Sequence, residues 1–177
     1  MTLFSLRFSP RFALLFAALA VLFGAAQTQL WAASPATVRG FDPVAFFSGS
    51  TEGNGSLKQV FSSAQTTHVT GVGKMQADGY LVIDQIVKIE GETMKNRQWR
   101  LHETKPGSFS GTLSDAKGPV AAVVSGNQLR IRYKMPDGLS VSQVLTIAQD
   151  GKSARNAMKI RKFGIVVATL DETIRRI

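Results

Sequence analysis

The sequence contains no cysteine among its 177 residues. This absence excludes disulfides, thiolate metal sites, a cysteine nucleophile and a lipid-bearing cysteine. Histidine is scarce as well, because His68 and His102 are the only two and they do not have the spacing of a metal-ligand pair. The segment Gly107–Gly111 resembles a nucleophile elbow but lacks a serine at its centre. The sequence therefore gives little support for an enzyme and implies no cofactor and no metal.

Long hydrophobic runs are also missing. The longest, Phe12–Phe23, is shorter than the roughly 20 apolar residues that a membrane-spanning helix needs. Arg7 and Arg11 precede or border this run, and the small residues Gly24, Ala25 and Ala26 follow it. This order predicts a signal peptide over residues 1–26. The alternative cleavage points extend as far as residue 33. An uncleaved anchor is the alternative.

What the chain does contain is a series of short runs in which apolar and polar residues alternate, each ended by Gly, Pro, Asn or Asp. Such runs predict antiparallel strands joined by hairpins. We expect residues 27–40 to be a flexible lead-in and residues 41–177 to form a single domain. About ten strands are predicted, the clearest over Tyr80–Ile89, and Asn54-Gly55 is predicted to be a hairpin turn. The fold class is all-β, an antiparallel up-and-down β-barrel, which leaves no strand edge exposed.

One short helical turn is predicted before the strands, over Asp42–Phe47. Asp42 suits the position that caps a helix, and Pro43 suits the first helical position. The aromatic residues Phe46 and Phe47 would then plug one end of the barrel, either as core residues or as part of a ligand site.

The hairpin around Glu90-Gly91 contains the first candidate site. A two-residue loop there would place Val82 opposite Trp99 and Asp84 opposite Arg97. We expect the face with Trp99 to point inward. Arg97 and Asp84 would then form a polar anchor inside a ligand cavity, although a structural ion pair is an open alternative, and a shift of one residue would reverse the faces. The candidate ligand-binding residues are Trp99, Arg97, Asp84, Tyr133, Leu101, Phe46 and Phe47.

A second candidate site is the strand over Gln128–Met135, in which Leu129, Ile131, Tyr133 and Met135 share one face. Arg130, Arg132 and Lys134 share the other, which we expect to face solvent. The whole chain is basic, with a net charge of +9. The basic face would favour an anionic membrane surface; the alternative is a face that only keeps the protein soluble. Nucleic acid is not expected, because aromatic residues do not interleave with the basic ones.

Several short motifs resemble one family of exported bacterial proteins. They are Phe46-Phe47-x-Gly49, Gly91-Glu92, Arg97-x-Trp99, Gly126-Asn127 with Tyr133, Asn156-x-Met158 and Phe163-Gly164. Their order and spacing resemble the domain-of-unknown-function 3833 family. This resemblance implies a lipocalin-like barrel, commonly a lipoprotein, although this chain lacks the cysteine that would bear the lipid. The family has no established activity, so the resemblance implies no catalytic residue.

Together these observations favour a non-enzymatic protein that binds an apolar or amphipathic small molecule or lipid in its barrel. The alternative is a structural or assembly protein of the cell envelope that acts through its basic outer surface. The signal peptide and the resemblance predict export to the periplasm or envelope of a Gram-negative bacterium.

Overall fold

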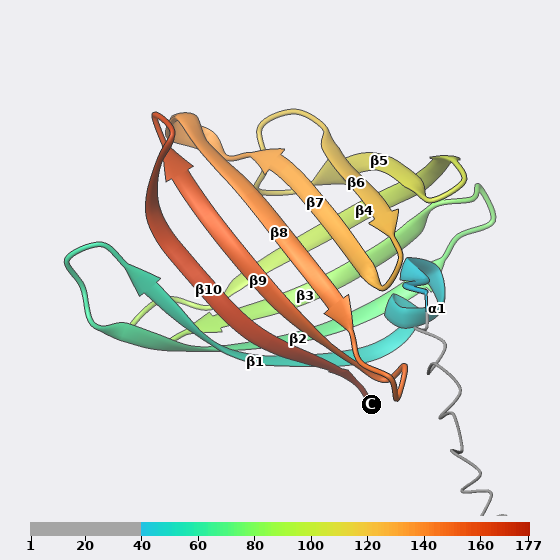
Figure 1. The fold of residues 1–177 in the computed structure, drawn as a ribbon, viewed down its shortest axis with the longest axis horizontal. Helices are drawn as coiled ribbons and strands as arrows, with labels where there is room; N and C mark the ends of the chain where they lie inside the picture. The colour runs from blue at the N-terminus through green and yellow to red at the C-terminus, as the bar shows by residue number, and fades with distance from the viewer. Residues whose placement is uncertain (1–39) are drawn as a thin grey trace, which may run out of the picture. The chain divides into compact units, whose positions relative to one another are not determined.

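The computed structural model describes residues 40–177, which form a closed antiparallel barrel of ten strands (Figure 1). The elements are α1 Pro43–Phe47, β1 Gly49–Gln59, β2 Ala64–Met75, β3 Leu81–Ile89, β4 Lys95–Lys105, β5 Ser108–Leu113, β6 Val120–Ser125, β7 Gln128–Lys134, η1 Pro136–Gly138, β8 Leu139–Ile147, β9 Ser153–Lys162 and β10 Ile165–Arg176. Among these residues no helix is long and apolar enough to cross a membrane. The predicted signal peptide, its cleavage point and residues 27–39 of the lead-in lie outside the described residues.

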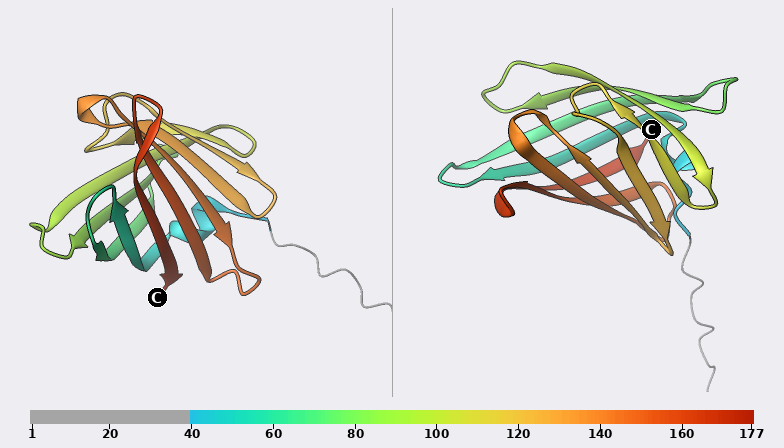
Figure 2. Two further views of the ribbon diagram at one scale, coloured as in Figure 1. Left: turned by 60° about the vertical axis from the view of Figure 1, so that its left-hand side comes forward. Right: turned by 90° about the horizontal axis from the view of Figure 1, so that it is seen from above.

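Each strand pairs with the next one along the chain, and β10 pairs with β1 to close the barrel. Figure 2 shows the resulting ring of strands from two further directions. The predicted all-β class, strand number and up-and-down order are confirmed. The closure satisfies the backbone groups that an open sheet would leave unpaired along two edges.

The core forms because inward residues alternate with outward ones along each strand. In β7, Leu129, Ile131 and Tyr133 are buried, whereas Arg130 and Arg132 between them are exposed. The two faces predicted for this strand are therefore confirmed. The same alternation places Leu81, Ile83, Trp99 and Leu101 of neighbouring strands in one buried cluster.

Strand β1 differs from the sequence prediction. Asn54-Gly55 is not a hairpin turn, because Asn54 lies mid-strand, opposite His68 of β2 and Thr173 of β10. Pairing on both sides outweighs the local turn preference of Asn-Gly. The adjacent glycine also has a packing role, since a Cβ at Gly53 would overlap the Glu172 carboxylate that lies over it.

Helix α1 forms as the sequence predicts. The Asp42 carboxylate accepts a hydrogen bond from the Ala45 N–H over 3.0 Å, and Pro43 occupies the first helical position. The helix lies against β2 at Gly73, where a Cβ would overlap the Phe47 carbonyl group. Three phenylalanines pack at this end of the barrel, with the Phe46 ring 5.4 Å from Phe41 and 5.0 Å from Phe47 between centroids.

The two ends of the barrel differ. Helix α1 and the even-to-odd turns, from β2–β3 to β8–β9, lie at the plugged end. The five odd-to-even turns, from β1–β2 to β9–β10, lie at the other end, which we call the mouth (Figure 1).

Candidate functional site

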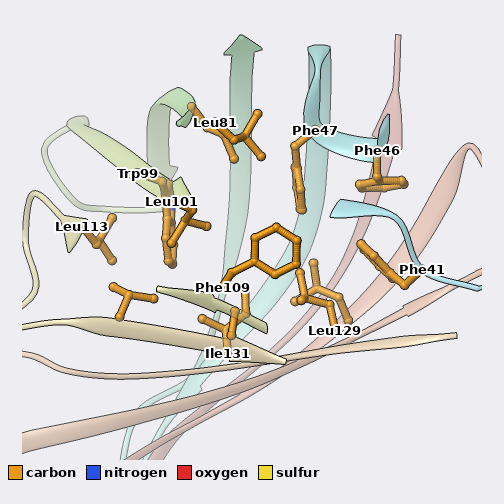
Figure 3. Close-up of a cluster of buried hydrophobic side chains, with 14 of the residues drawn as sticks. Phe41, Phe46, Phe47, Leu81, Trp99, Leu101, Phe109, Leu113, Leu129 and Ile131 are labelled. Atoms are coloured by element: carbon orange, nitrogen blue, oxygen red, sulfur yellow. The ribbon is translucent and has the colours of Figure 1, made fainter. Parts of the chain in front are cut away.

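The barrel encloses a cavity of about 720 Å³. Its wall is mostly apolar and includes Phe47, Leu81, Phe109, Leu129, Ile131 and Leu145. Figure 3 shows several of these side chains meeting near the plugged end. At the mouth the wall includes Phe61, which is fully exposed, so the cavity reaches solvent there. A volume within the roughly 300–1,000 Å³ range of small-molecule sites fits one ligand of moderate size.

Trp99 and Tyr133 form the aromatic part of the wall. Their rings meet edge to face with centroids 5.6 Å apart. The Trp99 Nε1–H donates to Gln85 Oε1 over 2.7 Å, and Gln143 Nε2 donates to the Tyr133 hydroxyl oxygen over 3.1 Å. Burial raises the pKa of Tyr133. Both aromatic residues are therefore held in one orientation by a polar partner, leaving ring surface towards the cavity.

Arg97 also lines the cavity, and its partner is Asp115 in the turn between β5 and β6. Arg97 Nη2 donates to Asp115 Oδ2 over 2.8 Å. One atom of each group, Arg97 Nε and Asp115 Oδ1, is buried without a hydrogen-bond partner among the described residues. The pair is neutral as a whole but retains one donor and one acceptor.

The predicted pairing of Asp84 with Arg97 is wrong. In the structure Arg97 lies opposite Gln85, and Asp84 lies opposite Gln98, whose Nε2 donates to Asp84 Oδ1 over 2.7 Å. The last paired residues of the hairpin are Val87 and Lys95, so the connection is longer than two residues and shifts the register by one. Asp84 therefore lies on the exposed outer face and is not part of the cavity wall.

Of the other predicted ligand-binding residues, Trp99, Arg97, Tyr133, Leu101 and Phe47 line the cavity. Phe46 is buried but is not part of the wall, because it packs against Phe41 and Phe47 in the plug. Trp99 thus points inward as predicted, but it lies opposite Ile83 and not opposite Val82.

The sequence analysis missed a polar pair on the opposite wall. Glu172 of β10 and Asn156 of β9 face each other in the ladder and are both buried. Asn156 Nδ2 donates to Glu172 Oε2 over 3.0 Å. Burial raises the pKa of Glu172, although the hydrogen bond from Asn156 and the charge of Arg97 act in the opposite direction. Alternation along β9 and β10 places Asn156 and Glu172 on the same face. That this face points into the barrel becomes clear only when β10 pairs with β1.

The remaining candidates lie outside the cavity. His68 contacts Asn54 on the outer face, and His102 packs against Tyr80, so neither histidine lines the cavity wall. Residues 40–177 contain no group of three or more His, Cys, Asp or Glu residues placed to hold a metal ion. Arg130, Arg132 and Lys134 are exposed on the outer face of β7.

Known structures show the same fold. An S-type phycobiliprotein lyase from Guillardia theta matches with a TM-score of 0.60 at 9% identity, covering 76% of this chain and 90% of that one. A protein of unknown function from the DUF3598 family of Nostoc punctiforme matches with a TM-score of 0.55 at 12% identity, covering 82% of this chain and 53% of that one. Identities this low show the fold alone, which is lipocalin-like as the resemblance implies.

The family comparison covers most of the chain. A comparison with curated proteins found no matching sequence. The model of one family, described as protein of unknown function (DUF3833), matches residues 19–176. The chain therefore belongs to the DUF3833 family.

Proposed function

We propose that the protein is a non-enzymatic binder of an apolar or amphipathic small molecule or lipid in the cell envelope. The observation that carries this proposal is the cavity of about 720 Å³, whose wall is mostly apolar and which is plugged at one end and open at the other. Transfer of an apolar ligand from water to such a wall is favourable by about 25 cal/mol per Å² of buried apolar surface. The N-terminal sequence supports the envelope location.

The proposal is tested first by native mass spectrometry of the protein purified from the cells that produce it. We expect extra mass that is released on denaturation as a small molecule. The stripped protein should then take up an apolar fluorescent probe such as N-phenylnaphthylamine. A bare mass together with no uptake of the probe would contradict a carrier function.

Two variants of one strand show whether the probe enters the cavity. Val69 of β2 lines the cavity, whereas Val72 of the same strand is 60% exposed on the outer face. Val69→Trp should reduce probe uptake because the indole occupies cavity volume, and Val72→Trp should leave it unchanged. Equal uptake by the two variants would place the probe elsewhere.

A second candidate function is docking on an anionic membrane, supported by a basic surface that runs along β7 and β9 to the mouth. The ladder aligns Arg132 of β7 and Lys159 of β9 on either side of Ser142, and Lys134 and Arg161 on either side of Ser140. We call these four residues, with Arg130 and Lys162, the basic wall. Positive charge on an exposed surface attracts anionic lipid headgroups.

Two aromatic residues lie in turns at the mouth, and one of them, Phe163, directly follows Lys162 of the basic wall. Phe61 ends the β1–β2 hairpin and is fully exposed, and Phe163 ends the β9–β10 hairpin and is 90% exposed. Both have positive φ angles, 64° and 51°, which are uncommon for a bulky residue. Exposed aromatic side chains next to basic ones suit insertion at a membrane interface. The mouth would then face the lipid.

Co-sedimentation with vesicles tests this second function. We expect binding to phosphatidylglycerol vesicles that weakens with salt, and no binding to phosphatidylcholine vesicles. The triple variant Arg130→Gln, Arg132→Gln, Lys134→Gln should bind more weakly. The control variant Lys74→Gln, Lys88→Gln, Lys105→Gln removes the same charge from exposed positions of β2, β3 and β4 and should bind as the parent does. Equal loss in both triple variants would indicate only a net-charge effect.

A further inference from the structure

Some polar atoms of the cavity wall have no hydrogen-bond partner. Among the described residues, the buried side-chain atoms Thr67 Oγ1, Asn156 Oδ1 and Glu172 Oε1 have no hydrogen-bond partner. All three residues line the cavity and are at most 5% exposed. Buried polar atoms are nearly always paired, and leaving one unpaired costs about 1–3 kcal/mol. Three such atoms on one wall therefore indicate a place where a ligand supplies the partners.

The strand register places these atoms in one row across the barrel wall. Thr67 of β2 lies opposite Gly55 of β1, Gly55 lies opposite Glu172 of β10, and Glu172 lies opposite Asn156 of β9. Neighbouring strands are about 4.8 Å apart, so Glu172 and Asn156 are immediate neighbours, whereas Thr67 lies two strands, roughly 10 Å, from Glu172.

Glycines of β1 make room for the Glu172 side chain. Gly55, between Thr67 and Glu172, contributes no side chain, and a Cβ there would meet the Cβ of Glu172. A Cβ at Gly53 would overlap Glu172 Oε1 itself. The Glu172 carboxylate therefore lies over bare backbone in the cavity wall.

The charges that line the cavity indicate what that ligand group is. Arg97 is paired with Asp115 at 2.8 Å, and Lys95 is paired with Glu92 at 3.0 Å. Glu172 is left as the carboxylate of the cavity wall without a cationic partner among residues 40–177. Once these two pairs are formed, the wall carries the single negative charge of Glu172.

Geometry and charge point to the same kind of group. Glu172 Oε1 and Asn156 Oδ1 belong to neighbouring residues and can each accept a hydrogen bond, and a primary ammonium is a charged donor. Hydrogen bonds in which both partners are charged are roughly twice as strong as neutral ones. A carboxylate head group would instead meet the Glu172 carboxylate, and Arg97 is already neutralised by Asp115.

We propose that Glu172 and its neighbour Asn156 form a subsite for the primary ammonium head of an amphipathic ligand whose apolar chain fills the barrel. This assignment rests on the proposed binding function and specifies its ligand as an amphipathic amine rather than a fatty acid.

The test compares three ligands that share one alkyl chain: dodecylamine, dodecanol and dodecanoate. Their binding to the purified protein is measured by isothermal titration calorimetry below their micelle concentrations. We expect dodecylamine to bind roughly tenfold or more tightly than dodecanoate, with dodecanol between them, because a hydrogen bond to a charged group contributes about 1.5–3 kcal/mol.

Two variants assign this preference to the subsite. Glu172→Gln keeps the shape and removes the charge, and it should lower the affinity for dodecylamine roughly tenfold while leaving that for dodecanol within about twofold. Thr67→Val removes a polar atom two strands from Glu172 and should leave the affinity for the amine within about twofold. The control, Asp84→Asn, removes a carboxylate from the exposed outer face of β3, and it should leave the affinity for the amine unchanged.

The outcomes separate the subsite from the cavity. If dodecanoate binds as tightly as dodecylamine, or if Glu172→Gln keeps the preference for the amine, the ammonium subsite is overturned and the cavity remains a binder of apolar chains. If none of the three ligands binds, the proposed binding function itself fails.

Discussion

At the scale of single residues, Glu172 has the most unusual environment in the barrel. Its pKa is raised above the ordinary value of 4.5 mainly by burial. The charged group that acts on it across the cavity is Arg97, which is paired with Asp115. Because the ligand-free folded state holds this proton more tightly than the unfolded chain does, the contribution of Glu172 to stability falls as pH rises from 4.5 through the raised pKa.

This sign gives a prediction for Glu172→Gln. The variant should be more stable than the parent at neutral pH, and the difference between their unfolding free energies should grow as pH rises from about 4 to 8. Urea unfolding at several pH values, in the absence of ligand, measures this difference. The control is Glu52→Gln on the outer face of β1, for which we expect no such growth. A difference for Glu172→Gln that stays constant with pH would contradict the buried, unpaired state of this carboxylate.

The residues also show what the sequence could and could not predict. The inward phase of Tyr133 followed from alternation, because the period of a strand is local, whereas that of Trp99 followed from its bulk in a strand whose two faces are both mixed. The partner of Arg97 did not, since it depends on the length of the Glu90–Met94 connection and on Asp115, which lies in a different hairpin. The surroundings of Glu172 depend on β10 closing against the glycines of β1, a contact between the two ends of the domain. Such contacts are set by the completed barrel and not by any local pattern.

At the scale of elements, helix α1 is the part that turns an open barrel into a cavity closed at one end. Its position depends on Phe46, which is 2% exposed, and on the aromatic contacts to Phe41 and Phe47. The element was predictable because its cap and its first proline are adjacent in sequence. Its docking on Gly73 was not, because that glycine belongs to β2.

We expect Phe46→Ala to destabilise the protein by about 3–5 kcal/mol, the usual effect of removing a buried phenyl ring. Thermal unfolding followed by circular dichroism should show a clear decrease in Tm. Phe163→Ala is the matched control, because Phe163 is 90% exposed and its removal creates no cavity. Similar Tm values for the parent and for Phe46→Ala would mean that α1 does not act as a structural plug.

At the scale of the whole molecule, the cavity entrance, one end of the basic wall and the two exposed phenylalanines all lie at the mouth. The cavity opens at the mouth, Phe61 and Phe163 are at the tips of two mouth hairpins, and Lys134 and Lys162 are at the mouth ends of β7 and β9. The ladder contact from Val60 N–H to the Val167 carbonyl holds the two phenylalanine hairpins together over 2.9 Å. A membrane bound at this end would therefore lie directly over the entrance.

This arrangement predicts that uptake of an apolar ligand from a membrane depends on the mouth and not only on affinity. N-phenylnaphthylamine should pass to the protein faster from phosphatidylglycerol vesicles than from phosphatidylcholine vesicles. Changing both Phe61 and Phe163 to Ser should slow the transfer from the anionic vesicles several-fold, because exposed aromatic side chains contribute to interfacial binding. The measured quantity is the initial rate of the change in probe fluorescence after mixing.

Two measurements separate docking from binding in this experiment. The affinity of the double variant for the probe in vesicle-free solution should stay within about twofold of the parent, because most of the cavity wall is unchanged. The control, in which Val72 and Val123 are both changed to Ser, removes two exposed apolar side chains from the outer faces of β2 and β6 and should transfer the probe as the parent does. Equal rates for the Phe variant and the parent would show that ligand reaches the cavity through water. In that case the basic wall would have no part in delivery, and the cavity alone would account for the function.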